Sequence, residues 1–261
     1  MKESLLLVLS AFVVATALTV TVAAGQEPGR GGRGGGRGTA PAAPQPPVPR
    51  LPDGTVDLDG LWVGGGPVQD FEVQAKMKPG EIPLLPEARK LMDSRKPEDD
   101  PHAYCMPHGP VRVTPYPYRF VPTTTSTRGK VMFIILESAN NTYRQIFMDG
   151  RKHPEDPDPS WWGHSIGWWE KDTLVIDSVG FNGMWWFDRR GHPHTEKLHL
   201  IERWTRTSYN TLEREITIDD PGAYSRPWTT KFVATLQPAN QELMEYVCIE
   251  NNHYGVAGGW R

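Results

Sequence analysis

The sequence predicts a mainly β fold, an antiparallel up-and-down barrel of about ten strands with one short helix. Runs rich in Val, Ile, Thr and aromatic residues alternate with short turn segments, at the spacing typical of consecutive hairpins. Only residues 86–95 carry a convincing helix pattern. A closed barrel is favoured over an open sandwich because closure removes exposed strand edges.

Residues 1–24 are expected to form an export signal. Lys2 precedes an uncharged apolar run from Leu5 to Val22, and small residues then lead to an expected cleavage point after Ala24. An uncleaved membrane anchor is the alternative, since this run is just long enough to span a bilayer. We therefore expect a periplasmic or secreted protein that has no membrane contact once the signal is removed.

Residues 25–50 are expected to be a disordered Gly/Arg/Pro-rich linker, followed by a single β-barrel domain over residues 51–261. The linker has almost no large apolar side chains, so it cannot offset the entropy cost of becoming ordered. Its few arginines and the formal net charge of -3 argue against a nucleic-acid partner. The mixed charge also gives no indication of a lipid surface as partner, and the sequence does not indicate an oligomeric state.

The chain contains two cysteines, Cys105 and Cys248. In an exported protein, an even pair is most simply explained as a disulfide. The alternative, a pair of metal ligands, lacks the local Cys-x-x-Cys or Cys-x-x-His spacing of such sites. We predict a disulfide that closes a long loop.

The first predicted elements are a short strand at residues 58–63 and a helix at residues 86–95. The helix has Pro86 in its first turn with Glu87 beside it and basic residues toward its end, as expected for an N-terminal proline and the helix dipole. Residues 96–108 are polar and interrupted by proline, and they place Cys105 on a loop.

From residue 118 onward the pattern predicts five hairpins in succession. Each pairs two strand-like runs across a short segment of turn residues. The expected strands are 118–125 with 130–137, 142–148 returning through a turn at 138–141, 165–169 with 173–179, 198–206 with 212–218, and 228–236 with 243–250.

Alternation in two of these strands predicts a pair of charged residues on the inward face. Even positions of 198–204 and 212–218 are apolar apart from Glu202 and Arg214. A hairpin would make the two side chains diagonal neighbours. Because an unpaired buried charge costs several kcal/mol, they should either pair structurally or meet a ligand.

Short sequence motifs in the chain resemble those of two known protein families. Gly60-Leu61-Trp62 is similar to the Gly-x-Trp signature that opens lipocalins, which implies a lipocalin-like barrel. Longer motifs resemble a large family of exported, functionally uncharacterised bacterial β proteins, which implies export but no reaction and no catalytic residues. These motifs are CMPHGPVR (105–112), DGRKHP (149–154), WWEKDTLVID (168–177), TIDDP (217–221), PWT (227–229) and EYVCIENN (245–252).

Residues 161–199 are the predicted site for a small-molecule ligand, because tryptophans and histidines gather there. Neighbouring tryptophans on a strand point to opposite faces, so each Trp-Trp pair should send one indole inward and one outward. Such indoles can stack on an aromatic or sugar-like compound. The predicted ligand-binding residues are Trp162, His164, Trp169, Trp186, His153, Glu202 and Arg214.

The alternative function is a periplasmic acid–base enzyme, a lyase, isomerase or hydrolase. His194 would act as acid or base and Asp188 would orient it, since a histidine titrating near neutrality between carboxylates suits this role. His192-Pro193-His194 also raises the question of a metal site. The glutamates lie at the wrong spacing for a cupin-like set, so a metal site is kept only as the disfavoured alternative, and no other cofactor is expected.

Overall fold

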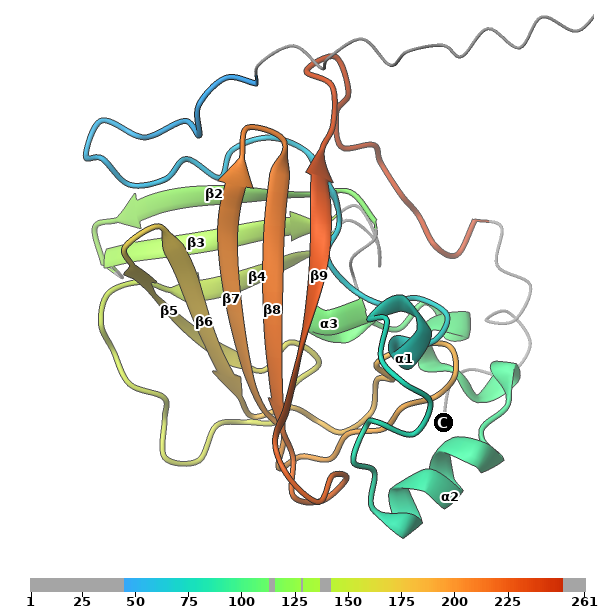
Figure 1. Ribbon diagram of the computed structural model, residues 1–261. Helices are drawn as coiled ribbons and strands as arrows, with labels where there is room; N and C mark the ends of the chain where they lie inside the picture. Colours follow the sequence, from blue (N-terminus) through green and yellow to red (C-terminus); the bar gives the residue numbers. More distant parts are fainter. Residues whose placement is uncertain (1–44, 113–115, 128, 137–141, 251–261) are drawn as a thin grey trace, which may run out of the picture. The chain divides into compact units, whose positions relative to one another are not determined.

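The computed structural model describes residues 45–112, 116–127, 129–136 and 142–250. Within these residues, nine strands form one sheet that closes in a ring (Figure 1), because β1 (Trp62–Gly64) pairs with both β2 (Tyr118–Thr125) and β9 (Trp228–Leu236). The other strands are β3 (Gly129–Leu136), β4 (Tyr143–Phe147), β5 (His164–Glu170), β6 (Thr173–Val179), β7 (His199–Ser208) and β8 (Thr211–Asp219). The predicted mainly β fold is therefore confirmed. The proposed signal peptide, most of the linker and the turn at 138–141 lie outside the described residues.

One strand pair departs from the predicted antiparallel meander. The strands follow one another around the ring in sequence order, but β4 and β5 are parallel and share only two residue pairs, Ile146 with Ser165 and Phe147 with Ile166. The connecting residues 148–163 therefore cross from one end of the ring to the other. Pro154, Pro157 and Pro159 lie in this crossover, and proline cannot donate to a strand ladder.

The strand predicted at residues 243–250 is not formed. β9 already pairs with β8 on one side and with β1 on the other, so no strand edge remains there for this segment. The segment is instead joined to the rest of the domain by the predicted disulfide between Cys105 and Cys248, whose Cα atoms are 5.6 Å apart.

The described residues contain more helices than the one that was predicted. The predicted helix is present as α2 (Pro86–Ser94), and the described residues also contain α1 (Phe71–Gln74), α3 (Gly109–Arg112) and the 3₁₀ turns η1 (Pro97–Asp99) and η2 (Pro101–Tyr104). A four-residue helix has no periodicity to detect, which explains why α1 and α3 were missed. No helix of the described residues is long and apolar enough to span a membrane.

The two ends of the ring differ in how they are filled. At one end of the ring, β2 stops and β3, β6 and β8 begin. We call this the open end. The opposite end, the covered end, lies beneath the short helices and the loop of residues 181–198 (Figure 1). An aromatic core fills the covered end, where Phe71 of α1 packs among Trp185, Phe187, Trp228 and Phe232. This division determines which predicted site residues can be reached from solvent.

Candidate functional site

A cavity of about 690 Å³ lies at the open end of the ring. Its walls come from β2, β3 and β5, from residues just after β4, and from the segment of residues 51–59 that precedes β1. The apolar lining residues are Leu51, Val56, Leu58, Phe120, Pro122, Val131, Met132, Met148, Trp168 and Trp169. The polar ones include Asp53, Thr55, Asp57, Asp59, Thr123, Thr124 and Lys130.

Strand alternation explains which side chains face this cavity. In β5, Ser165 and Gly167 are buried on the inward face, and Trp169 continues that face to pack against the core inside the ring. Trp168 also borders the cavity, but it lies on the opposite face of β5, is 40 % exposed and donates its indole N–H to Glu170. The predicted division of Trp168 and Trp169 between opposite faces is confirmed, and Trp169 lines the cavity.

Residues 50–59 are attached to the rim of the open end at three places. Arg50 donates two hydrogen bonds to the Asp172 carboxylate, of 2.6 and 2.8 Å, in the turn between β5 and β6. Asp59 accepts from Arg119 of β2 at 2.8 Å, and the Asp57 carbonyl accepts from Arg206 of β7 at 2.6 Å. These contacts hold the segment against three separate strands or turns, and so fix one wall of the cavity.

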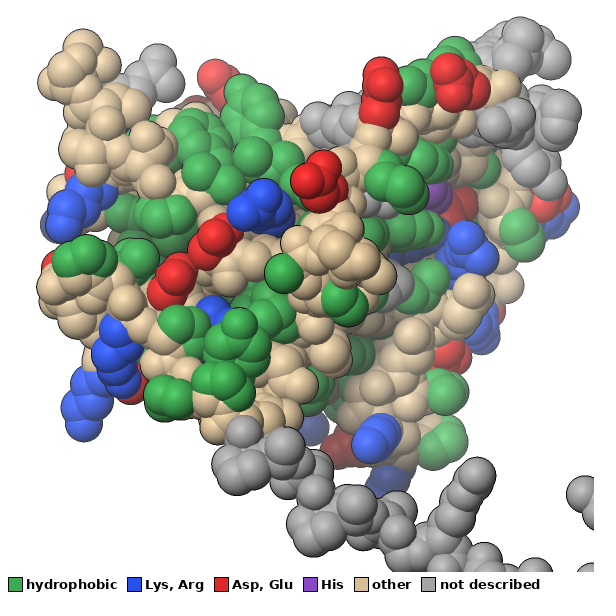
Figure 2. All heavy atoms as spheres, turned by 90° about the horizontal axis from the view of Figure 1, so that it is seen from above, with side chains coloured by type: hydrophobic (Ala, Val, Ile, Leu, Met, Phe, Trp, Pro, Cys, Tyr) green, Lys and Arg blue, Asp and Glu red, His purple; other side chains and the backbone are tan. Residues whose placement is uncertain are grey.

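The rim of the cavity carries ionised groups. The pKa of the Asp59 carboxyl is lowered chiefly by the hydrogen bond from Arg119, and the pKa of Asp53 is lowered by backbone N–H donation from Thr55. Figure 2 looks at the molecule from above and shows apolar side chains beside acidic and basic ones on this face. The cavity thus combines an apolar wall with a few polar groups.

Residues 51–59 were not predicted to form part of a site. The signal was present, because Val56 and Leu58 alternate with Asp57 and Asp59, and Asp53-Gly54 is a turn dipeptide. Val56 and Leu58 are 1 % and 4 % exposed and belong to the core of the ring. What the sequence could not show is which strands this segment would lie against.

Glu202 and Arg214 form the predicted ion pair inside the ring. The Arg214 Nη2 donates to Glu202 Oε1 at 2.5 Å, and both side chains are fully buried. A third residue that was not predicted, Arg144 of β4, places its Nη1 2.5 Å from Glu202 Oε2. The even, inward positions Arg144 and Ile146 could have indicated this, since alternation in β4 matches that in β7 and β8.

The surroundings of this charged triad satisfy much of its hydrogen-bonding capacity. Arg144 donates to the hydroxyls of Ser165 and Ser178, at 3.2 and 2.7 Å. Arg214 donates to the carbonyls of Gly65 and Pro110, at 2.9 and 2.8 Å, and lies over the Trp204 ring. Burial acts to raise the pKa of Glu202, but the two guanidiniums outweigh it and the pKa is lowered. The triad is therefore an ionised element of the interior whose charges pair with one another.

His194 lies inside the aromatic core of the covered end. Its ring centroid is 4.0 Å from that of Trp185, and Phe181 and Phe187 meet it edge-on. Its Nδ1 is 3.1 Å from the Thr195 carbonyl oxygen, and only 4 % of the residue is exposed. Burial lowers the pKa of His194 to about 3. An imidazole that is buried among aromatic rings in this way does not support the expected role as an acid or base.

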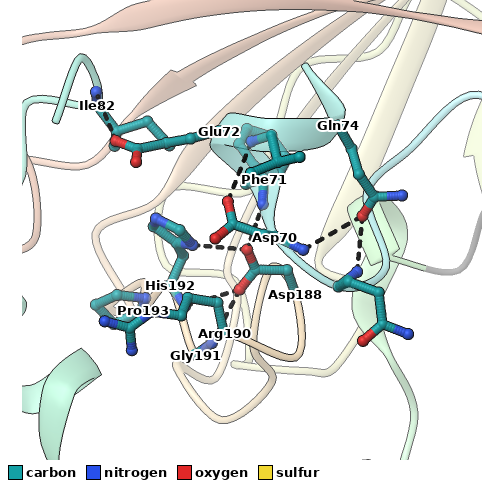
Figure 3. Close-up of polar contacts among 12 residues, drawn as sticks. Asp70, Phe71, Glu72, Gln74, Ile82, Asp188, Arg190, Gly191, His192 and Pro193 are labelled. Carbon is teal, nitrogen blue, oxygen red and sulfur yellow. Dashed lines mark hydrogen bonds and ion pairs between the residues drawn. The ribbon is translucent and has the colours of Figure 1, made fainter. Parts of the chain in front are cut away.

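Asp188 contacts His192, and the predicted pair with His194 is not formed. Its carboxylate accepts from the backbone N–H groups of Phe71, Gly191 and His192, at 2.6, 2.9 and 3.0 Å, and lies 2.7 Å from His192 Nδ1 (Figure 3). These bonds join the loop of residues 188–192 to the first residue of α1. Asp188 therefore organises the covered end, a role that its position in the sequence does not reveal.

The His192-Pro193-His194 motif does not bring its imidazoles to one point. His192 contacts Asp188, whereas His194 contacts the Thr195 carbonyl. Across the part of the chain that the structure describes, no group of three or more His, Cys, Asp or Glu side chains has an arrangement suited to a metal ion.

The remaining predicted ligand residues lie at separate places. Trp186 is buried beneath the guanidinium of Arg95, which lies 4.6 Å from its ring centroid. Trp162 packs against the core inside the ring and borders a second depression on its outside. His153 and His164 lie on that outer face, with their Nδ1 atoms 2.8 Å apart. The structure thus divides the predicted ligand-binding set, and only Trp169 lines the open-end cavity.

Comparisons of the chain with protein-family models, with curated proteins and with solved structures found no match.

Proposed function

We propose that this is an exported protein with a lipocalin-like barrel that binds a small organic ligand, aromatic or sugar-like, in the open-end cavity. The observation that carries the proposal is the contrast between the two halves of the ring interior. The charged triad and the aromatic core fill one half, whereas the other holds a cavity of about 690 Å³. Ligand sites commonly have volumes of roughly 300–1,000 Å³ and walls that are mainly apolar.

The lining supports a ring-shaped ligand with polar substituents. Phe120, Met132 and Trp169 offer flat or polarisable surfaces on which such a ring can pack. Asp53, Asp57 and Lys130 at the cavity can form hydrogen bonds with hydroxyl or carboxyl groups of the ligand. Export and membership of the family that the motifs resemble are parts of the same proposal, and the disulfide is compatible with an oxidising compartment.

A cavity-filling substitution tests this proposal. Met132 faces the cavity, so Met132→Trp should occupy part of its volume, whereas Ile135→Trp adds the same side chain on the outward face of the same strand. We expect Met132→Trp to weaken binding of a fluorescent aromatic probe such as anilinonaphthalene sulfonate at least about tenfold, equivalent to about 1.4 kcal/mol. The measurement is a fluorescence titration of the full chain.

Ile135→Trp should bind the probe within about twofold of the unsubstituted protein, a difference of about 0.4 kcal/mol. Equal probe affinity in both variants would contradict the proposed site. Thermal melts of each variant show whether the substituted chains are folded.

A further inference from the structure

Three histidines and one aspartate gather on the outward face of the ring. We call His153, His164, His199 and Asp177 the outer histidine cluster. His164, Asp177 and His199 occupy outward positions of β5, β6 and β7, and His153 comes from the crossover between β4 and β5. None of these residues lines the open-end cavity, and they play no part in the function proposed above.

The hydrogen bonds of the cluster are consistent with one placement of its protons, in which His153 is neutral. Asp177 Oδ1 is 3.1 Å from His153 Nε2 and 2.8 Å from His199 Nε2. An ionised carboxylate can only accept, so both of these Nε2 atoms carry hydrogen. A neutral His153 then has a bare Nδ1, which accepts from His164 Nδ1 at 2.8 Å. His164 in turn is left with a bare Nε2.

A depression of about 600 Å³ lies beside His164. It forms where β4 and crossover residues 154–163 separate, next to the two-pair parallel contact between β4 and β5. Tyr143, Phe147 and Trp162 line it together with Asp158, Ser160 and His164. The rings of Phe147 and His164 are stacked, with centroids 5.2 Å apart and an interplanar angle of 23°.

We propose that His164 is the general base of a second site, in which a flat aromatic compound with an acidic C–H lies in this depression. His164 Nε2 would take the proton. The electron pair of the C–H bond would form a new π bond as a leaving group departs with its own bonding pair. The Nδ1 proton of His164 can move to His153 Nδ1, which brings the positive charge next to Asp177. His153 and Asp177 are therefore positioning residues.

The charges around His164 support a neutral base at pH 7. The pKa of His164 is lowered, first by partial burial and then by the neighbouring His153 and Arg151. The pKa of His199 is raised by its hydrogen bond to Asp177. The other titratable groups that line the depression are Asp158 and Tyr143, and Arg151 lies over the Phe147 ring at 3.9 Å.

Elimination of 5-nitrobenzisoxazole tests the proposal, because a base removes its C–H proton as the ring N–O bond breaks. With the full chain, we expect His164→Gln to lower the rate about 100-fold or more, the usual contribution of a general base. Asp177→Asn should lower the rate and shift the midpoint of the pH–rate profile downward, because the carboxylate that stabilises the protonated pair is gone. Glu215→Gln, on the outward face of β8 and outside the cluster, is the control and should stay within about threefold of the unsubstituted rate, about 0.65 kcal/mol.

If the unsubstituted protein eliminates the substrate no faster than His164→Gln does, the proposal is overturned. An Asp177→Asn variant whose pH midpoint does not move would overturn it as well. A second measurement needs no substitution: the ¹⁵N spectrum of histidine-labelled protein should show His164 protonated at Nδ1 and bare at Nε2. The opposite tautomer would also overturn the proposal.

Discussion

At the scale of single residues, His194 and His164 show how burial changes what an imidazole can do. Both come from the tryptophan- and histidine-rich stretch that sequence analysis selected. His194 is enclosed by Trp185, Phe181 and Phe187, so its neutral form contributes packing. His164 is only partly buried, borders a depression and has a partner at its Nδ1. Sequence spacing cannot separate these two environments, because alternation says nothing about which loop covers a strand end.

His194 should make the fold sensitive to acid. Its pKa is about 3 in the folded chain, below the ordinary value of 6.5, so the unfolded chain binds more protons between these values. Stability is therefore lost as the pH falls from about 6.5 toward 3, by up to several kcal/mol at about 1.4 kcal/mol per pKa unit. His194→Phe should lose less stability over this range, as measured by urea unfolding at a series of pH values. Parallel pH profiles for the two proteins would mean that His194 is not buried in its neutral form.

At the scale of elements, the charged triad connects three strands across the ring interior. Arg144 lies on β4, Glu202 on β7 and Arg214 on β8, so their contacts join strands that do not all pair directly with one another. A buried ion pair is not in itself a strong source of stability. It does select one arrangement, because a register shift of one residue in any of these strands would turn its charge toward the outside.

Removing the central carboxylate should be costly. Glu202→Leu leaves two buried guanidiniums without their counter-ion, so we expect a loss of about 3–5 kcal/mol in the free energy of unfolding. Glu215→Leu is the control: Glu215 faces outward on β8 and pairs with Lys231 at 3.3 Å, a surface contact worth about 0–1 kcal/mol. Urea unfolding of both variants measures the difference. A similar loss in the free energy of unfolding for both variants would show that the Glu202 carboxylate is not needed to stabilise the two buried guanidiniums.

The strands that were predicted correctly are those whose residues alternate between apolar and polar and whose ends are marked by neighbouring turn residues. The bounds of β2, β6 and β9 match the expected runs, because alternation and flanking turn residues mark both ends. The parallel β4–β5 pair and the absence of a strand at 243–250 depend instead on ring closure. Whether a run finds a strand edge is decided by β1, which lies more than 160 residues earlier than β9. No local pattern contains that information.

At the scale of the whole domain, the ring interior has three successive regions. The open-end cavity comes first, the charged triad lies in the middle, and the aromatic core closes the covered end. Trp169 was among the predicted ligand-binding residues and does line the cavity, whereas the other predicted residues, expected together at one end of the barrel, lie elsewhere. The cavity was not foreseeable, since one of its walls is residues 51–59, which are held at the rim by long-range contacts of Arg50, Asp57 and Asp59 and by burial of Val56 and Leu58 in the ring core.

The most direct test of the ligand-binding proposal uses the methionine methyl groups as reporters. Met132 and Met148 line the open-end cavity, whereas Met184 and Met244 are 40 % and 69 % exposed and lie outside it. In ¹³C-methyl NMR spectra recorded with a panel of aromatic and sugar-like compounds, we expect a binding compound to shift the Met132 and Met148 signals and to leave those of Met184 and Met244 unchanged. The open-end cavity is not the ligand site if no compound in the panel shifts the Met132 or Met148 signals. The same conclusion follows if every compound that binds shifts the signals of Met184 or Met244 and leaves those of Met132 and Met148 unchanged.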